Sequence, residues 1–167
     1  MTESIAIWFT EKLGGVFSCE IIVFIVSLMP ILELRGGILA AYAMGMDFLP
    51  AFIVSFVGNM LPIPFILLFI QKIFGFLKKT RFKNAAYYFE KKAMAKSDII
   101  NKYAYLGVLI FVAIPLPGTG AWTGALIASM LKLDTKKALL TISIGVFIAG
   151  IIVSLISYGL LNAIGIG

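Results

Sequence analysis

The stretch "IFVAIPLPGTGAWTGALIA", which runs from Ile110 to Ala128, decides the fold. Both of its ends are apolar and suit a lipid bilayer, but its centre, "PLPGTG" at Pro115–Gly120, carries two prolines and two glycines. Proline removes a backbone donor and glycine weakens a helix, so this centre should interrupt any helix that enters it. The pattern predicts two short helical arms, about Tyr103–Ile114 and Ala121–Leu131, on either side of a break.

The composition indicates a membrane protein. Of the 167 residues, 61% are hydrophobic, and the mean hydropathy of +1.06 is far above that of a soluble domain. The apolar runs Phe48–Ile70 and Ala138–Ile164 are long enough to cross about 30 Å of hydrocarbon. We therefore predict an all-α integral membrane protein with a single membrane domain at 1–167, which crosses the plasma membrane more than once.

The residue types exclude several functions. One cysteine, Cys19, and no histidine exclude a disulfide framework, a zinc site and a histidine-based catalytic triad. The sequence also has no glycine-rich nucleotide-binding loop and no acid–base pair of the kind that enzymes use. We predict a protein that is not an enzyme and has no metal, no cofactor and no catalytic residues.

The charges predict the orientation in the membrane. Gln71–Lys102 carries nine Lys or Arg against two acidic residues, whereas the first twenty residues carry one Lys against three Glu. Basic excess marks the cytoplasmic side, so 71–102 is predicted to be a basic, amphipathic cytoplasmic segment. Its interleaved aromatic residues favour anionic lipid headgroups as partners rather than nucleic acid. Residues 1–16 are predicted to form a short interfacial helix.

The chain contains an internal repeat. A shift of 87 residues aligns Ile21–Ile70 with Val108–Ser157 without a gap and gives nine identities, among them Pro30 with Pro117, Gly37 with Gly124, Asp47 with Asp134 and Gly58 with Gly145. Two units are predicted, at 17–70 and 103–167, each a helical hairpin followed by one long helix. In the first unit the arms are about Phe17–Leu32 and Ile38–Met46, with "ELRGG" (Glu33–Gly37) as the break. The two aspartates are predicted to cap the long helices.

Arm length and charge predict that the hairpins are re-entrant. An arm of about a dozen residues spans about 18 Å, roughly half a bilayer. The second hairpin has basic residues on both flanks, so it should enter and leave on the cytoplasmic side. One long crossing in each unit then inverts the second unit relative to the first, and the two hairpin tips meet near the midplane. The alternative is an ordinary bundle of four to six helices with proline kinks.

The candidate site lies at the two tips. Glu33 and Arg35 are charged residues deep in an apolar stretch, which usually face a cavity or each other. We interpret Arg35 as an anion anchor and Glu33 as a proton carrier, with a purely structural ion pair as the alternative. The predicted substrate- and proton-binding residues are Glu33, Arg35, Gly36, Gly37, Asn59, Pro115, Pro117, Gly118, Thr119, Gly120, Trp122 and Thr123.

Each residue type has its own reason to belong to the site. The glycines let a ligand approach the backbone, and two helix N-termini at the tips favour an anion such as a phosphate or carboxylate. Thr119 or Thr123 could cap the second arm or contact a ligand. Trp122 either packs or touches substrate, and Asn59 either lines the cavity or forms a helix–helix hydrogen bond.

The motifs "PILELRGGI" (Pro30–Ile38) and "PLPGTGAWTGALIA" (Pro115–Ala128) resemble those of the small multidrug export proteins. That family is similar to a distant branch of the DedA, or VTT-domain, membrane proteins. The resemblance implies paired re-entrant hairpins and proton-driven movement of polyprenyl phosphate or other lipids. It also implies that Glu33 and Arg35 correspond to the acidic and basic residues of the first hairpin. The second hairpin departs from the DedA pattern because it has no arginine.

These observations predict a DedA-type transporter, a proton-coupled flippase or exporter for an anionic lipid-like substrate such as a polyprenyl phosphate. One alternative is a small multidrug antiporter that exchanges protons for hydrophobic cations at Glu33. The other is a membrane scaffold without transport. A cation site needs a carboxylate free of Arg35, whereas an anion site needs Arg35 free. The sequence leaves a homodimer open.

Overall fold

The computed structural model describes residues 18–69, 97–116 and 118–160, and in this part of the chain every regular element is a helix. Two helices, Phe48–Phe69 and Thr135–Gly159, are long and apolar enough to cross a membrane. These agree with the two predicted crossings. The predicted interfacial helix at 1–16 and most of the basic segment at 71–102 lie outside the described residues.

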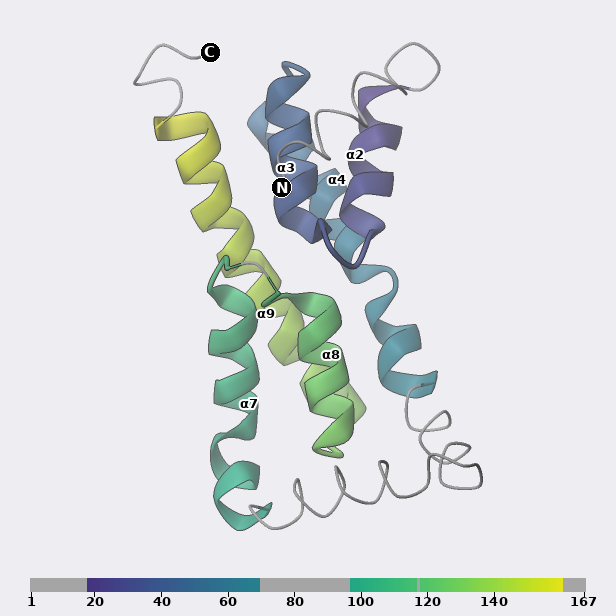
Figure 1. Ribbon diagram of the computed structural model, residues 1–167, viewed down its shortest axis with the longest axis vertical. Coiled ribbons are helices and arrows are strands. Elements are labelled where there is room, and N and C mark those ends of the chain that lie inside the picture. The colour runs from purple at the N-terminus through teal and green to yellow at the C-terminus, as the bar shows by residue number, and fades with distance from the viewer. Residues whose placement is uncertain (1–17, 70–96, 117, 161–167) are drawn as a thin grey trace.

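The first half consists of α2 (Cys19–Leu28), α3 (Glu33–Ala43) and α4 (Phe48–Met60), and a turn at Leu61–Pro62 separates α4 from a further helix at 63–69. α2 and α3 lie side by side with opposite directions, and α4 packs against both (Figure 1). The predicted break at Glu33–Gly37 is wrong. The chain turns at 29–32 instead, around Pro30, and α3 already begins at Glu33.

The second half repeats this order with α7 (Ser97–Ala113), α8 (Ala121–Met130) and α9 (Thr135–Ser154), which continues into the π-helical turn η1 (Leu155–Leu160). The helix breaks between Ala113 and Ala121, as the prolines and glycines there predict. α8 packs on α7 and α9.

The second helix of each hairpin ends in the same way. After α3, the N–H of Gly45 donates to the carbonyl of Tyr42 over 3.0 Å, and after α8 the N–H of Lys132 donates to the carbonyl of Ser129 over 3.1 Å. Gly45 has φ 70° and Lys132 has φ 53°, the left-handed conformation that closes a Schellman motif. The two motifs are 87 residues apart, the same offset that aligns the sequences.

The long helices then start at equivalent aspartates. Asp134 occupies the N-cap of α9, and its carboxylate accepts a hydrogen bond from the N–H of Lys137 at 3.0 Å, as predicted. Asp47 occupies the N-cap of α4, but its side chain makes no capping hydrogen bond. The predicted position is correct for both residues, whereas the predicted bond forms only at Asp134.

Glycines bring each long helix close to the first arm of its hairpin. A Cβ atom at Gly58 in α4 would lie 2.8 Å from the carbonyl oxygen of Phe24 in α2. At the equivalent Gly145 in α9, a Cβ would lie 3.1 Å from the carbonyl oxygen of Leu109 in α7. Small residues allow such close approach of helices where both neighbours are apolar.

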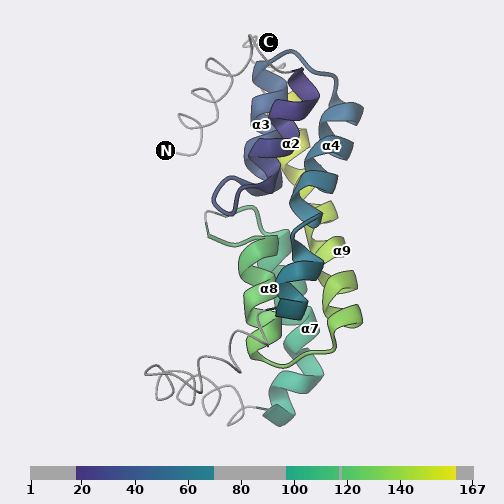
Figure 2. The same cartoon turned by 90° about the vertical axis from the view of Figure 1, so that its right-hand side faces the viewer.

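The two hairpins face each other near the middle of the molecule. The turn between α2 and α3 points toward the turn between α7 and α8, and α9 runs along both halves (Figures 1 and 2). A single buried cluster joins the halves, since Leu34 of α3, Val112 of α7 and Val146 of α9 all belong to it. The outer faces of α4 and α9 are apolar and exposed, for example at Leu49 and Leu140, as expected for side chains that meet lipid.

Candidate functional site

The side chain of Glu33, which belongs to the first hairpin, contacts the second hairpin. Its carboxylate accepts hydrogen bonds from the N–H groups of Ala121, at 3.1 Å, and Trp122, at 3.3 Å, which are the first two residues of α8. The Glu33 side chain is buried, with 7% of its surface exposed. A carboxylate at this end of a helix satisfies free N–H groups and interacts favourably with the helix dipole. Glu33 thus caps α8 from another part of the chain.

Gly120 makes room for this carboxylate. It occupies the N-cap position of α8 and has no side chain that could cap the helix itself. A Cβ atom at Gly120 would lie 1.7 Å from Oε2 of Glu33. Two atoms that are not bonded to each other cannot come this close. The glycine predicted to admit a ligand to the backbone therefore admits the Glu33 side chain in this structure.

Arg35 also crosses to the second hairpin. Its guanidinium donates from Nη1 to the carbonyl of Leu116 and from Nη2 to the hydroxyl of Thr119, the second bond at 3.1 Å. The Thr119 hydroxyl also accepts from the N–H of Leu116 at 3.2 Å and lies 2.7 Å from the carbonyl of Ile114, to which it can donate. Thr119 orders its own loop, and neither Thr119 nor Thr123 caps α8, whose N-cap is Gly120 without a side-chain cap. Contact of either threonine with a ligand stays a prediction.

Glu33 and Arg35 therefore bind different parts of the second hairpin. Glu33 holds the start of α8, and Arg35 holds the loop at 114–119 that leads into it. We call these two sets of hydrogen bonds the tip clasp. A purely structural ion pair between Glu33 and Arg35 stays a hypothesis, and these contacts show in addition that both side chains bind the second hairpin.

Gly36 and Gly37 lie within α3 and do not form a break. A Cβ atom at Gly37 would lie 1.8 Å from Oγ of Ser27 in α2 and 2.7 Å from Oγ of Ser55 in α4. At Gly36 a Cβ would lie 2.6 Å from the Cβ of Leu32. The glycine pair allows α3 to pack closely against its neighbours. It does not form the break between helices that the sequence suggested.

A groove runs between the two tips and encloses about 1170 Å³ of empty space, part of it open to the surroundings. We call it the tip groove. Its polar lining comes from Glu33, Arg35, Thr119 and Thr123, and its apolar lining includes Ile31. Of the other predicted residues, it includes Gly36, Pro115 and Gly118. Apolar walls around a few charged groups are typical of sites for small amphiphilic molecules.

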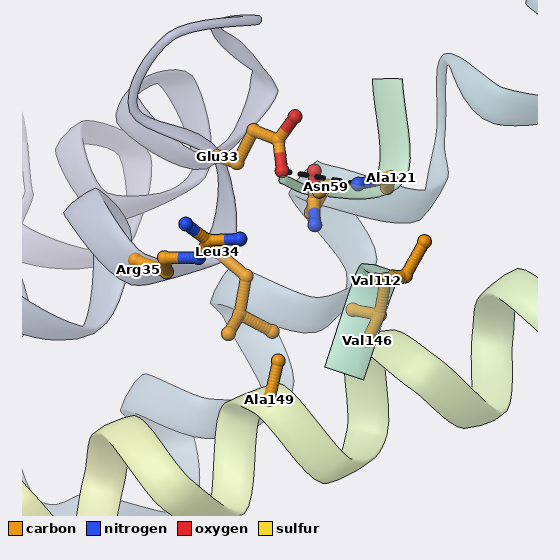
Figure 3. A pocket seen from close by; sticks show the side chains of 9 residues that line it. Glu33, Leu34, Arg35, Asn59, Val112, Ala121, Val146 and Ala149 are labelled. Atoms are coloured by element: carbon orange, nitrogen blue, oxygen red, sulfur yellow. Dashed lines mark hydrogen bonds between the residues drawn. The ribbon is translucent and has the colours of Figure 1, made fainter. Parts of the chain in front are cut away.

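A smaller pocket, with room for about one water molecule, lies on the inner side of the same two charged residues. We call it the inner pocket, and Figure 3 shows its lining. Glu33 and Arg35 line it together with Asn59, Gly120 and Ala121, and the rest of its wall is apolar. Asn59 is 2% exposed, and its Oδ1 atom has no hydrogen-bond partner. The structure thus places Asn59 at a cavity and does not place Oδ1 in a helix–helix hydrogen bond.

The last two predicted site residues are Trp122 and Pro117. The side chain of Trp122 lines neither pocket and packs against the buried cluster, and only its backbone N–H reaches Glu33. Pro117 lies outside the described residues. Val153 and Ile156, from α9 and η1, line the tip groove. No signal in the sequence points to these two residues, because they are ordinary apolar residues in an apolar helix.

The described residues contain no group of His, Cys, Asp and Glu side chains that could hold a metal ion. Over the described residues, the fold and the site define a helical membrane protein in which charged and polar groups gather between two apolar halves. Residues 33–152 match the family described as "Putative small multi-drug export protein", and the chain belongs to this family. The match begins at Glu33 and covers both sides of the tip clasp. Among curated proteins and among solved structures, nothing matches the chain.

Proposed function

We propose that this family member is a DedA-type transporter, a proton-coupled flippase or exporter that moves an anionic lipid-like molecule, such as a polyprenyl phosphate, across the plasma membrane. The observation that carries the proposal is the placement of Arg35 and Glu33 together in a groove with apolar walls. An amphiphilic anion needs a cationic anchor for its headgroup and an apolar surface for its chain. The export function named by the family is consistent with this proposal.

The short helices support a re-entrant arrangement. α2 and α8 have 10 residues each and α3 has 11. At 1.5 Å per residue such helices reach only about half of the roughly 30 Å hydrocarbon layer. The non-helical turns between them would then lie at membrane depth, where backbone is tolerated if protein or a cavity covers it. The tip clasp and the tip groove supply that cover.

Equivalent contacts in the two halves support an inverted repeat. The Schellman motifs after α3 and α8 and the aspartates that begin α4 and α9 recur at the offset of 87 residues. The same offset pairs Glu33 with Gly120, and these two residues touch. In an assembly of two equivalent units, equivalent residues meet at the two-fold axis. The tips would therefore lie on the axis, where transporters built from inverted repeats bind substrate.

The guanidinium of Arg35 suits the headgroup of the proposed substrate. It carries five N–H donors in a planar fork, and contacts to Leu116 and Thr119 use two of its nitrogens. Arginine binds phosphate with two parallel hydrogen bonds. Ile31, Leu39, Val153 and Ile156 line the groove beside it and offer a surface for an acyl or prenyl chain.

Glu33 would couple transport to protons through the tip clasp. Its ionised carboxylate accepts two N–H groups of α8. Protonation removes the charge that strengthens these bonds and leaves the helix N-terminus less well satisfied. The two hairpins could then separate at the tips and open the groove toward one side of the membrane.

An antiporter for hydrophobic cations is the second candidate. The family description names multidrug export, and Glu33 lines the tip groove. In this mechanism the Glu33 carboxylate would leave α8 to bind the cation and would release it on protonation. Glu33 bonds α8 and not Arg35, which favours this mechanism by the criterion above. Arg35 opposes it, since it places a positive charge in the same groove.

Binding of a polyprenyl phosphate to purified protein, measured across pH 5 to 8 or thereabouts, tests the main proposal. We expect Arg35→Ala to abolish binding and Glu33→Gln to preserve it but remove its pH dependence. A hydrophobic phosphonium cation in parallel assays tests the alternative. Lipid binding that survives Arg35→Ala, or cation binding that needs Glu33 and not Arg35, would overturn the anion proposal. A scaffold would tolerate both substitutions in any functional assay.

A further inference from the structure

We propose that the N-terminus of α8 is an oxyanion-binding subsite and that Glu33 occupies it as an internal ligand, which the phosphate or carboxylate of a substrate replaces. The proposal deepens the function proposed above, on which it rests for the role of the subsite in transport. It adds a second anion contact beyond Arg35, built from the backbone of the second hairpin.

A carboxylate already lies in the subsite. The N–H groups of Ala121 and Trp122 bind the two oxygens of Glu33 separately, at 3.1 and 3.3 Å. Two adjacent N–H groups at the first turn of a helix bind carboxylate and phosphate oxygens alike. The Glu33 carboxylate thus stands where an oxygen pair of a substrate headgroup would bind.

The pocket around this position has an unsatisfied polar group. Asn59, which is 2% exposed, lines the inner pocket beside Glu33 and Ala121, and its Oδ1 has no hydrogen-bond partner (Figure 3). A buried acceptor without a donor is unfavourable. The O–H of a protonated phosphate oxygen, or of protonated Glu33, would supply the donor. Asn59 therefore leaves an acceptor beside the subsite that a donor on a bound headgroup, or on protonated Glu33, would satisfy.

Glu33, whose carboxylate occupies the subsite, has a backbone conformation that residues with a Cβ atom rarely adopt. Its φ is 52°, in the left-handed region. Such conformations persist where surrounding contacts enforce them, and they often mark functional positions. Arg35 is the other charged group lining the inner pocket, since α4, α7, α8 and α9 contribute uncharged side chains there.

A substrate in the tip groove would be next to the subsite. Glu33 and Arg35 line both the groove and the inner pocket, so they separate the two spaces. An anion that binds Arg35 from the groove needs only the departure of the Glu33 carboxylate to reach Ala121 and Trp122. The exchange of one negative group for another keeps the charge at the start of α8 unchanged.

Removing the internal ligand tests the proposal. The chain has two tryptophans, so Trp8→Phe leaves Trp122, at the subsite, as the single fluorescent reporter. In this background we expect Glu33→Ala to bind inorganic phosphate about tenfold or more tightly than the parent, because the subsite no longer needs to be vacated. Acetate and dodecyl phosphate, titrated in the same way, separate the contribution of the headgroup from that of the chain.

Two second substitutions make the test specific. Gly120→Ala, added to Glu33→Ala, should reverse the gain, because its methyl group occupies the place of the anion. Gly107→Ala should leave the gain unchanged, because a Cβ at Gly107 would meet nothing within 4 Å. Should Glu33→Ala not fold, Glu33→Gln replaces it, with an expected gain of about threefold from the lost charge.

Equal phosphate affinity with and without Glu33, or a gain that Gly120→Ala does not reverse, would overturn the subsite. Polyprenyl phosphate binding to the wild type is measured in parallel. Failure of that binding with a normal gain in Glu33→Ala would reject the lipid substrate and leave the subsite standing. Normal lipid binding through Arg35, without tighter phosphate binding in Glu33→Ala, would reject the subsite and leave the lipid substrate standing.

Discussion

Glu33 and Ala121 are joined by a 3.1 Å hydrogen bond from backbone to carboxylate, although 88 positions separate them in the chain. The bond supplies α8 with a cap that its own N-cap residue, a glycine, cannot provide. The same carboxylate is the acidic group of the candidate site. Contacts that stabilise the fold and the groups proposed to bind substrate are therefore shared at the tips, and substitutions there should separate the two roles.

Substitutions at Thr119 test the Arg35 side of the tip clasp. Thr119→Val removes the hydroxyl that accepts from Arg35 and from the N–H of Leu116, whereas Thr119→Ser keeps it. We expect Thr119→Val to lower the free energy of unfolding by about 1–3 kcal/mol and Thr119→Ser to change it by less than about 1 kcal/mol. Denaturant unfolding in detergent micelles measures both. Equal values for the two variants would show that the hydroxyl does not hold the loop.

Gly37 tests whether close packing, rather than flexibility, explains the glycine pair in α3. Gly37→Ala would place a methyl group 1.8 Å from Oγ of Ser27, so we expect a loss of about 1–3 kcal/mol in unfolding free energy. Adding Ser27→Ala removes the oxygen and should restore part of that loss. A double-mutant cycle measures the coupling. Additive effects of the two substitutions would contradict the packing explanation.

The two hairpins differ in how well the sequence predicted them. The break before Ala121 was predictable because two prolines and two glycines stand together in "PLPGTG". In the first hairpin the charges and glycines of "ELRGG" suggested a break, yet the turn centres on Pro30 and the glycines serve helix packing. Local sequence does not distinguish a glycine that breaks a helix from one that admits a neighbouring helix.

Glu33 and Arg35 were identifiable as site candidates, because charged residues are rare in apolar segments. Their partners were not, since the contacts to Ala121, Leu116 and Thr119 depend on how two distant hairpins meet. The internal repeat contained a partial clue. Its offset pairs Glu33 with Gly120, and residues related in this way come together if the two units meet tip to tip.

The Schellman motif after α3 gives a prediction about backbone conformation alone. Gly45 has φ 70°, and a Cβ there would meet nothing within 4 Å. Gly45→Ala should therefore cost about 1 kcal/mol through the left-handed conformation only. Gly107→Ala, equally free of contacts but inside α7, should stabilise the protein by about 0.4–1 kcal/mol. Thermal unfolding of both variants checks the opposite signs, and equal signs would contradict the assigned conformation.

Cysteine labelling tests the membrane topology. Cys19→Ser gives a cysteine-free chain, into which single cysteines at Lys102, Lys136 and Asp47 are introduced. If α7 and α8 form a re-entrant hairpin, the first two label from the cytoplasm and the third from outside. Impermeant maleimide on intact cells and on inverted vesicles measures this. Labelling of Lys102→Cys and Lys136→Cys from opposite sides would mean that the segment crosses the membrane.

Asn59 separates stability from function most clearly. Its Oδ1 is buried without a partner, and an unsatisfied acceptor in an apolar protein lowers stability. Asn59→Leu keeps the branched shape of the side chain, with bulkier ends, and removes the acceptor, so we expect the free energy of unfolding to stay the same or rise by about 1 kcal/mol. Binding of polyprenyl phosphate should fall, because the inner pocket loses the group that would accept a hydrogen bond from the headgroup.

Matched measurements on one protein preparation decide between the roles of Asn59. Unfolding in detergent gives stability, and a lipid-binding titration gives function. Ser55→Ala is the control, since Ser55 lies one turn earlier in α4, is equally buried without a partner, and does not line the inner pocket. It should leave binding unchanged. A loss of stability in Asn59→Leu with unchanged binding would show instead that Asn59 is a structural residue between helices.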